Sequence, residues 1–230
     1  TFQQYKGVGQ TRAILADALN ALADGYQPSS VAIDVILADE SDEATDAKLE
    51  AAMRRTPNLA LSVEVLDGKW ESPLERFRKH ARRVGHVHPE ESLDDGICRR
   101  IPIVVHTDDN SVAFLPLGIP DYRTIGSAAQ GRTVELPTGS LRVRYRLGGI
   151  PTVSVAALKA GRISREIIAG KHVFVGVTSL SGRRDQVATP LGGTISGVLI
   201  HAFVNETYLR GFSNGLRADA RPSTVLFVAL

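Results

Sequence analysis

The chain has 230 residues, of which 43% are hydrophobic and 23% charged, and this composition is typical of a folded globular protein rather than a disordered one. Its formal net charge of +2 gives no reason to expect a nucleic-acid partner. A single cysteine, Cys98, excludes an internal disulfide and a cysteine-cluster metal site. The sequence therefore indicates one large domain, whose function must come from polar side chains other than cysteine.

Helical and strand patterns alternate in the N-terminal part of the chain. Apolar residues between 14 and 22 recur at helical spacing, and the run VAIDVIL at 31–37 indicates a buried strand. Asp34 is a charged residue within this apolar strand, so its carboxylate must have hydrogen-bonding or charged partners in the fold. The acidic loop 39–46 leads into a second helix, and 59–65 alternates as a strand. This alternation predicts an α/β fold, a layered mixed sheet flanked by helices.

Two hairpins predict an antiparallel portion of that fold. In residues 85–105, a short strand precedes the turn formers Asp94-Asp95-Gly96, and a second strand carries Arg99. Residues 133–136 and 141–146 indicate two further strands around the turn sequence PTGS. The expected fold is therefore mixed rather than wholly parallel.

A pair of histidines raises the question of a metal site. His86 and His88 fall on one face of a strand, and with Glu90 or Glu91 they could bind a metal ion. A catalytic zinc usually takes three protein ligands, so we expect no metal here. The sequence also has no phosphate-binding P-loop, and we expect no cofactor.

The segment from 170 to 211 is the most informative part of the chain. Residues 173–177 predict a strand covered on both faces, 179–185 predict a polar loop, and apolar residues from 195 to 209 predict an amphipathic helix. Ser196 and Gly197 suit the entrance of this helix, where backbone N–H groups lack partners.

Polar side chains in this segment and in the first hairpin are the candidates for a ligand site. One interpretation is a pocket at the carboxyl end of a strand, where open α/β sheets bind ligands. The other is that the same side chains tie the loop together and that His201 is a half-buried helix residue. The candidates are Arg184, Asp185, Thr189, His201 and Asn205, with Asp94 and Arg99 as further contributors.

The apolar run TVLFVAL at 224–230 has two interpretations. Seven residues cannot cross a bilayer, which needs about 20. The run could be a terminal strand or the first turns of a membrane helix. Its composition alone favours neither.

The order of motifs resembles the type-2 CHASE domain, a sensor module of bacterial membrane receptors. The resemblance extends from about Gly9 to Gly211 and is specific because five motifs occur in the order of that family. They are AIDVILADE at 32–40, D-x-x-L-E at 46–50, GHVH followed by LDDGICRRIP at 93–102, LRVRYRLGG at 141–149, and GKHVFVGVTSLSGRRDQVATPL with SGVLIHAFVNETYLRG.

The resemblance implies a domain outside the cytoplasmic membrane, residues 1–222, followed by the start of a membrane helix at 223–230. It also implies an early strand and a membrane anchor upstream of Thr1. The expected partners are the linked membrane helices, a cytoplasmic output domain, and an unknown small molecule or periplasmic protein, with a possible homodimer. The output would be a nucleotide cyclase, a histidine or serine/threonine kinase, or a diguanylate cyclase.

The leading hypothesis is thus a sensory ectodomain of a bacterial receptor without catalysis of its own. One alternative is a periplasmic dimerisation or protein-interaction module, in which the polar motifs only hold the fold. A second alternative is a small hydrolase that uses Asp34, Asp185 and His201, with the histidine as base.

Overall fold

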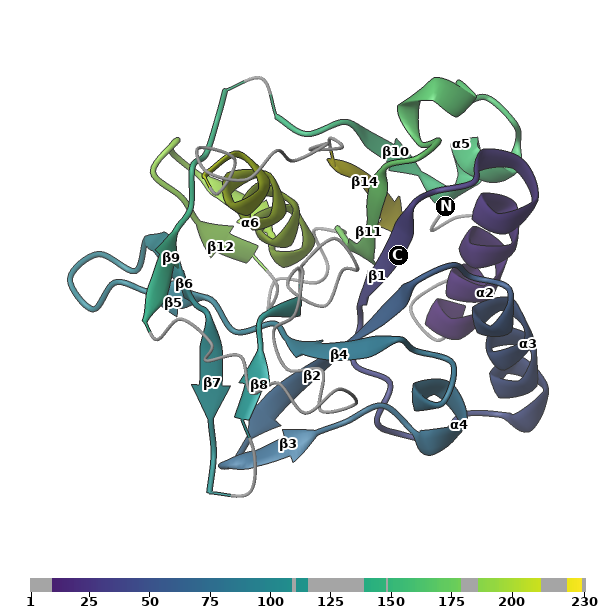
Figure 1. The fold of residues 1–230 in the computed structure, drawn as a ribbon, viewed down its shortest axis with the longest axis horizontal. Coiled ribbons are helices and arrows are strands. Elements are labelled where there is room, and N and C mark those ends of the chain that lie inside the picture. Colours follow the sequence, from purple (N-terminus) through teal and green to yellow (C-terminus); the bar gives the residue numbers. More distant parts are fainter. Residues whose placement is uncertain are drawn as a thin grey trace, which may run out of the picture.

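The structure is a computed structural model and describes residues 10–108, 111–115, 139–147, 149–178, 186–211 and 223–228. Its centre is a seven-stranded sheet in the order β10-β14-β11-β1-β2-β3, in which β4 also pairs with β2 (Figure 1). All pairings are parallel except that of β3 with β2. The strands are β1 (Ser30–Asp34), β2 (Leu59–Leu66), β3 (Lys69–Glu71), β4 (Arg83–His86), β10 (Thr152–Ser154), β11 (His172–Val177) and β14 (Ser223–Val228).

Helices cover one face of this sheet with a continuous apolar core. Strand alternation turns Val31 and Ile33 of β1, and Val173 and Val175 of β11, toward that face. Asp42 begins α3 by accepting a hydrogen bond from the backbone N–H of Thr45 at 2.9 Å. The helices are α2 (Thr11–Ala21), its π-helical continuation (Leu22–Tyr26), α3 (Glu43–Arg54), α4 (Glu75–Arg78) and α5 (Val155–Lys159), with a 3₁₀ turn at Arg165–Ile167.

The other face is covered by α6 (Gly197–Gly211) and by small antiparallel sheets (Figure 1). This confirms the predicted fold class of a mixed, layered sheet with antiparallel pairs. β5, β6 and β9 form a three-stranded sheet, β7 pairs with β8, and β12 pairs with β13. These strands are β5 (Glu90–Glu91), β6 (Cys98–Pro102), β7 (Val104–His106), β8 (Ser111–Ala113), β9 (Ser140–Arg142), β12 (Gln186–Ala188) and β13 (Thr194–Ser196).

The predicted start of α6 is confirmed, but its amphipathic character is wrong. Every residue from Val198 to Thr207 is buried except Leu199, which is half-buried. The reason is that α6 lies between two layers, with β11 and β14 on one side and the sheet containing β9 on the other. A helix covered on both sides has no solvent-exposed face, so its sequence need not carry a stripe of polar residues.

Glycine at position 176 allows α6 to approach the central sheet closely. A Cβ atom at this position of β11 would lie 2.6 Å from Cβ of Val198 on α6. Only a residue without a side chain fits at such a distance. Gly176 therefore fixes the spacing between β11 and the first turn of α6.

Residues 223–228, which the resemblance assigned to the start of a membrane helix, form the strand β14. This strand lies between β10 and β11 and pairs in parallel with both. Of the two interpretations of the apolar run, the structure has the strand. Its β-branched residues suit an interior strand with neighbours on both sides. In the described part of the chain, no helix has the length and apolar character needed to cross a membrane.

Candidate functional site

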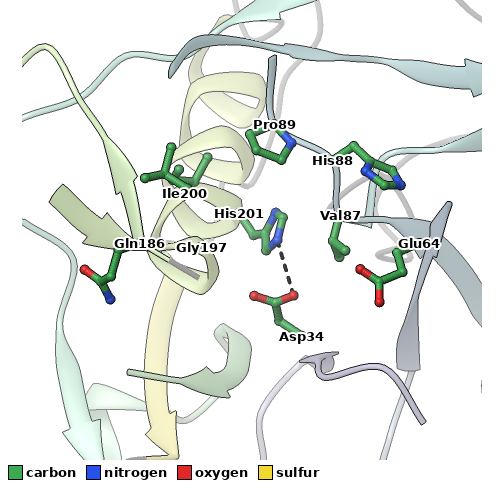
Figure 2. A pocket seen from close by; sticks show the side chains of 10 residues that line it. Asp34, Glu64, Val87, His88, Pro89, Gln186, Gly197, Ile200 and His201 are labelled. Carbon is green, nitrogen blue, oxygen red and sulfur yellow. Dashed lines mark ion pairs between the residues drawn. The ribbon is translucent and has the colours of Figure 1, made fainter. Parts of the chain in front are cut away.

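The central sheet has a topological switch point between β1 and β11. The connection that follows β1 leads to α3 on one face of the sheet, whereas the connection that follows β11 leads to α6 on the other. Connections that diverge in this way leave a crevice at the carboxyl ends of the two strands, where open α/β sheets bind ligands. The described residues contain a cavity of about 220 Å³ at this end of the sheet (Figure 2). Its walls are Asp34, Glu64, Val87, His88, Pro89, Gln186, Val187, Gly197, Ile200 and His201.

The centre of the site is a pair formed by Asp34 and His201. Asp34 is the last residue of β1 and, by strand alternation, faces α6 as Ala32 does. His201 lies on α6, and its Nε2 is 3.4 Å from Oδ1 of Asp34 (Figure 2). The aspartate and histidine side chains are 10% and 4% exposed. His201 is therefore the partner that Asp34, as a charged residue in an apolar strand, was predicted to need.

The second nitrogen of His201, Nδ1, is buried and has no hydrogen-bond partner among the described residues. Nε2 faces the Asp34 carboxylate, and in the tautomer with the proton on Nε2 the other nitrogen, Nδ1, is a hydrogen-bond acceptor. A buried acceptor without a donor costs free energy. The histidine thus retains hydrogen-bonding capacity that the described protein groups leave unused.

A second carboxylate, Glu64 of β2, lines the same cavity. Burial raises the pKa of Glu64, and the negative charges of Glu71 and Asp34 raise it further. Glu71 is the cross-strand neighbour of Glu64 on β3. Among the described residues no lysine or arginine pairs with Asp34 or Glu64, so two carboxylates line one cavity without a described basic side chain beside them.

Two more imidazoles lie beside these groups. The rings of His86 and His88 stack with centroids 5.9 Å apart, and Phe114 lies 5.2 Å from the ring of His86 and 5.0 Å from that of His201. His88 Nε2 accepts a 2.7 Å hydrogen bond from the backbone N–H of Val65. The backbone N–H of His88 in turn donates to Nδ1 of His86 at 3.3 Å. These contacts connect the end of β4 to both β2 and α6.

Burial keeps both of these imidazoles neutral at ordinary pH. Burial, together with the nearby His88 and His201 rings, lowers the pKa of His86 to about 3. Burial also lowers the pKa of His88. Within the described ranges, no three His, Cys, Asp or Glu side chains are arranged to hold a metal ion. His86 and His88 therefore act in this structure as neutral packing and hydrogen-bonding groups.

The predicted helix residues fall close to the site. His201 lines the cavity, and Asn205 lies one turn further along α6, buried and outside the lining. Thr189 lies in the turn after β12, where its backbone N–H donates to Gly193 at 3.2 Å. Its buried hydroxyl has no partner among the described residues. The structure brings His201 into the cavity wall, whereas Asn205 and Thr189 are not among the lining residues.

The predicted hairpin residues lie elsewhere. Asp94 is exposed in the turn between β5 and β6, and its backbone N–H donates to Ser92 at 3.3 Å. Arg99 donates two hydrogen bonds to the Asp95 carboxylate, at 2.8 and 2.7 Å. Neither Asp94 nor Arg99 lines the cavity. Arg184 and Asp185 lie outside the described residues.

Some cavity residues were not among the predicted site residues. Glu64 sits in an alternating strand, where a polar residue ordinarily indicates the solvent face. His88 was considered only as a metal ligand, and Gln186 follows the predicted polar loop. The sequence contains one signal that could have identified Glu64. It is an acidic residue near the carboxyl end of the strand that follows the Asp34 strand, and the carboxyl ends of parallel strands meet at one edge of a sheet.

The fold and cavity together define an α/β domain with a cavity of about 220 Å³ at its switch point. The chain belongs to the CHASE2 domain family, which matches residues 2–229. This confirms the family predicted from the motif order. CHASE2 is a family of sensory domains of signalling receptors, and its members are generally extracellular. Neither the curated proteins nor the solved structures include a match to this chain.

Proposed function

We propose that this domain is the extracytoplasmic sensory part of a bacterial transmembrane receptor and that the Asp34–His201 cavity receives its signal. Membership of a sensory family supports the role, and the buried pair at the switch point supports the location of the input. The receptor would link the domain to membrane helices and to a cytoplasmic output such as a nucleotide cyclase or a kinase.

The position of α6 supports a mechanism in which this helix transmits the effect of ligand binding to the rest of the domain. α6 carries His201 at the cavity and packs against β11 and β14 of the central sheet. A ligand that binds one arrangement of α6 more tightly than another shifts the population toward it. The signal is then the displacement of α6 relative to the sheet, without any chemical step.

The Asp34–His201 pair also resembles part of a hydrolytic site, which is the second candidate function. A carboxylate can orient a histidine that acts as general base. No Ser, Thr or Cys lines the described cavity, so the described residues supply no nucleophile for the histidine to activate. A panel of hydrolase substrates decides the matter: turnover that His201→Ala abolishes would favour the enzyme.

The sensory proposal is tested on the full-length gene product and on the isolated domain. We expect the full-length protein in the membrane fraction, with the domain cleaved by protease added from outside the cytoplasmic membrane. Small-molecule thermal-shift screening of the domain should then give ligands that stabilise the wild type and not His201→Ala. Equal stabilisation of both proteins would remove His201 from the site. A full-length protein without membrane helices would refute the receptor.

A further inference from the structure

The cavity offers hydrogen-bond acceptors and negative charge in excess of donors. Asp34 uses one oxygen toward His201, while no described lysine or arginine pairs with Glu64. His201 also lines the cavity, and its Nδ1 is buried without a partner among the described residues. The two carboxylates come from β1 and β2, so neighbouring strands of the central sheet bring both acceptors to one cavity.

Gln186 and one ring nitrogen of His88 in the cavity wall already have hydrogen-bond partners. The side-chain amide of Gln186 donates to Oγ of Ser196 at 3.1 Å, and its carbonyl accepts from Thr194 at 3.4 Å. Nε2 of His88 is occupied by the backbone N–H of Val65. The described residues that line the cavity include no lysine or arginine, so a ligand that brings N–H donors and positive charge would complement the two carboxylates.

We propose that the cavity binds a small organic ammonium ion, with the carboxylates of Asp34 and Glu64 as its counter-ions. The inference rests on the proposed sensory function and names the class of its ligand. Val87, Pro89 and Ile200 supply apolar wall for the carbon chain of such a molecule. The cavity of about 220 Å³ has room for several water molecules and therefore for a small organic molecule.

Other ligand classes fit the same walls less well. An anion would place another negative charge beside Asp34 and Glu64, and no lysine or arginine lines the described cavity to offset it. A metal ion needs several converging ligands, and the described residues contain no such group of three. An ammonium ion needs only carboxylates and lone pairs, which the site contains.

Isothermal titration of the whole 230-residue chain tests the class of ligand. The probes are methylamine, ethanolamine and putrescine, with 1,4-butanediol as the uncharged analogue and succinate as the anionic one. We expect at least one amine to bind and neither analogue to do so. Asp34→Asn and Glu64→Gln, which change charge and keep shape, should each weaken amine binding at least about tenfold. Glu166→Gln, an exposed carboxylate outside the cavity, is the matched control and should bind as the wild type does.

A second measurement does not depend on how well the variants fold. In the wild-type protein, the binding amine should shift the ring NMR signals of His88 and His201 and leave those of the exposed His106 unchanged. Binding of succinate, absence of binding by all three amines, or amine binding that both charge-removing variants retain would overturn the ammonium proposal. Each of these outcomes leaves the sensory proposal standing, because that proposal is decided separately by the membrane topology of the full-length protein.

Discussion

Substituting Gly176 by alanine should destabilise the domain, because this position of β11 lies directly beneath α6. The new Cβ would lie 2.6 Å from Cβ and 2.7 Å from Cγ2 of Val198, closer than Cβ atoms approach other atoms in proteins. α6 must then move away from the sheet or β11 must bend. Overpacking of this kind costs about 1–3 kcal/mol. At about 2–4 °C per kcal/mol for a chain of this size, the melting temperature should fall by about 2–12 °C.

Thermal unfolding followed by circular dichroism measures this effect, with Gly25→Ala as the matched control. Gly25 is exposed at the end of the first helix, and a Cβ there meets no atom within 4 Å. We expect Gly25→Ala to leave stability unchanged or to raise it by about 0.5–1 kcal/mol, because alanine has less conformational freedom in the unfolded chain.

Rescue of Gly176→Ala by Val198→Ala should be only partial. The second change removes the Cγ atoms but keeps Cβ, which is the atom closest to the new methyl group. If Gly176→Ala is as stable as Gly25→Ala, the close approach of α6 to β11 is wrong. The same substitution should weaken ligand binding, since α6 carries His201.

Three further predictions concern buried groups. Phe114→Ala should lower the free energy of unfolding by about 3–5 kcal/mol in urea titrations, because the ring is 1% exposed; a loss below 1 kcal/mol would contradict this packing. The folded pKa of His86, about 3, is below the unfolded value near 6.5, so the unfolded state binds the proton first. The wild type should therefore lose stability as pH falls from about 6.5 toward 3, by up to about 1.4 kcal/mol per pH unit from this group, and His86→Gln should lose less between pH 7 and 5. Equal losses would show that His86 is not the acid-sensitive group. Arg12→Met should lower the free energy of unfolding by about 1.5–3 kcal/mol in chemical denaturation, because the buried Asp46 keeps only the more distant Arg76, at 4.0 Å, as a cationic partner. Arg55→Met, whose pair with Asp24 is exposed, should cost at most about 1 kcal/mol, and equal losses for the two variants would refute this difference between a buried and an exposed pair.

The sequence predicted the positions of helices and strands better than the tertiary contacts that these elements make. β-branched runs located β1 and β11, and the Ser196-Gly197 pair located the start of α6. Asp34 could be recognised as a residue in need of a partner because a charge inside an apolar strand is costly. That the partner is His201 could not be predicted, since the contact depends on how α6 crosses the sheet.

The errors have a common physical origin in tertiary context. The pattern of the last apolar run is equally good for a membrane helix and for an interior strand, and pairing with β10 and β11 decides between them. Glu64 was not predicted as a site residue, because strand alternation does not show which strand lies beside it. The enclosure of α6 likewise depends on a second layer, which a single helix pattern cannot reveal.

The position of β14 has a consequence for the order of folding. β10 and β11 emerge earlier during synthesis than the strand that separates them in the finished sheet. Until residues 223–228 arrive, these two strands must stay apart, because a direct pairing between them would close the gap that β14 fills. Contacts this distant along the chain form slowly. We therefore expect completion of the sheet to be a late step of folding, and α6, which packs on β14, to reach its final position only then.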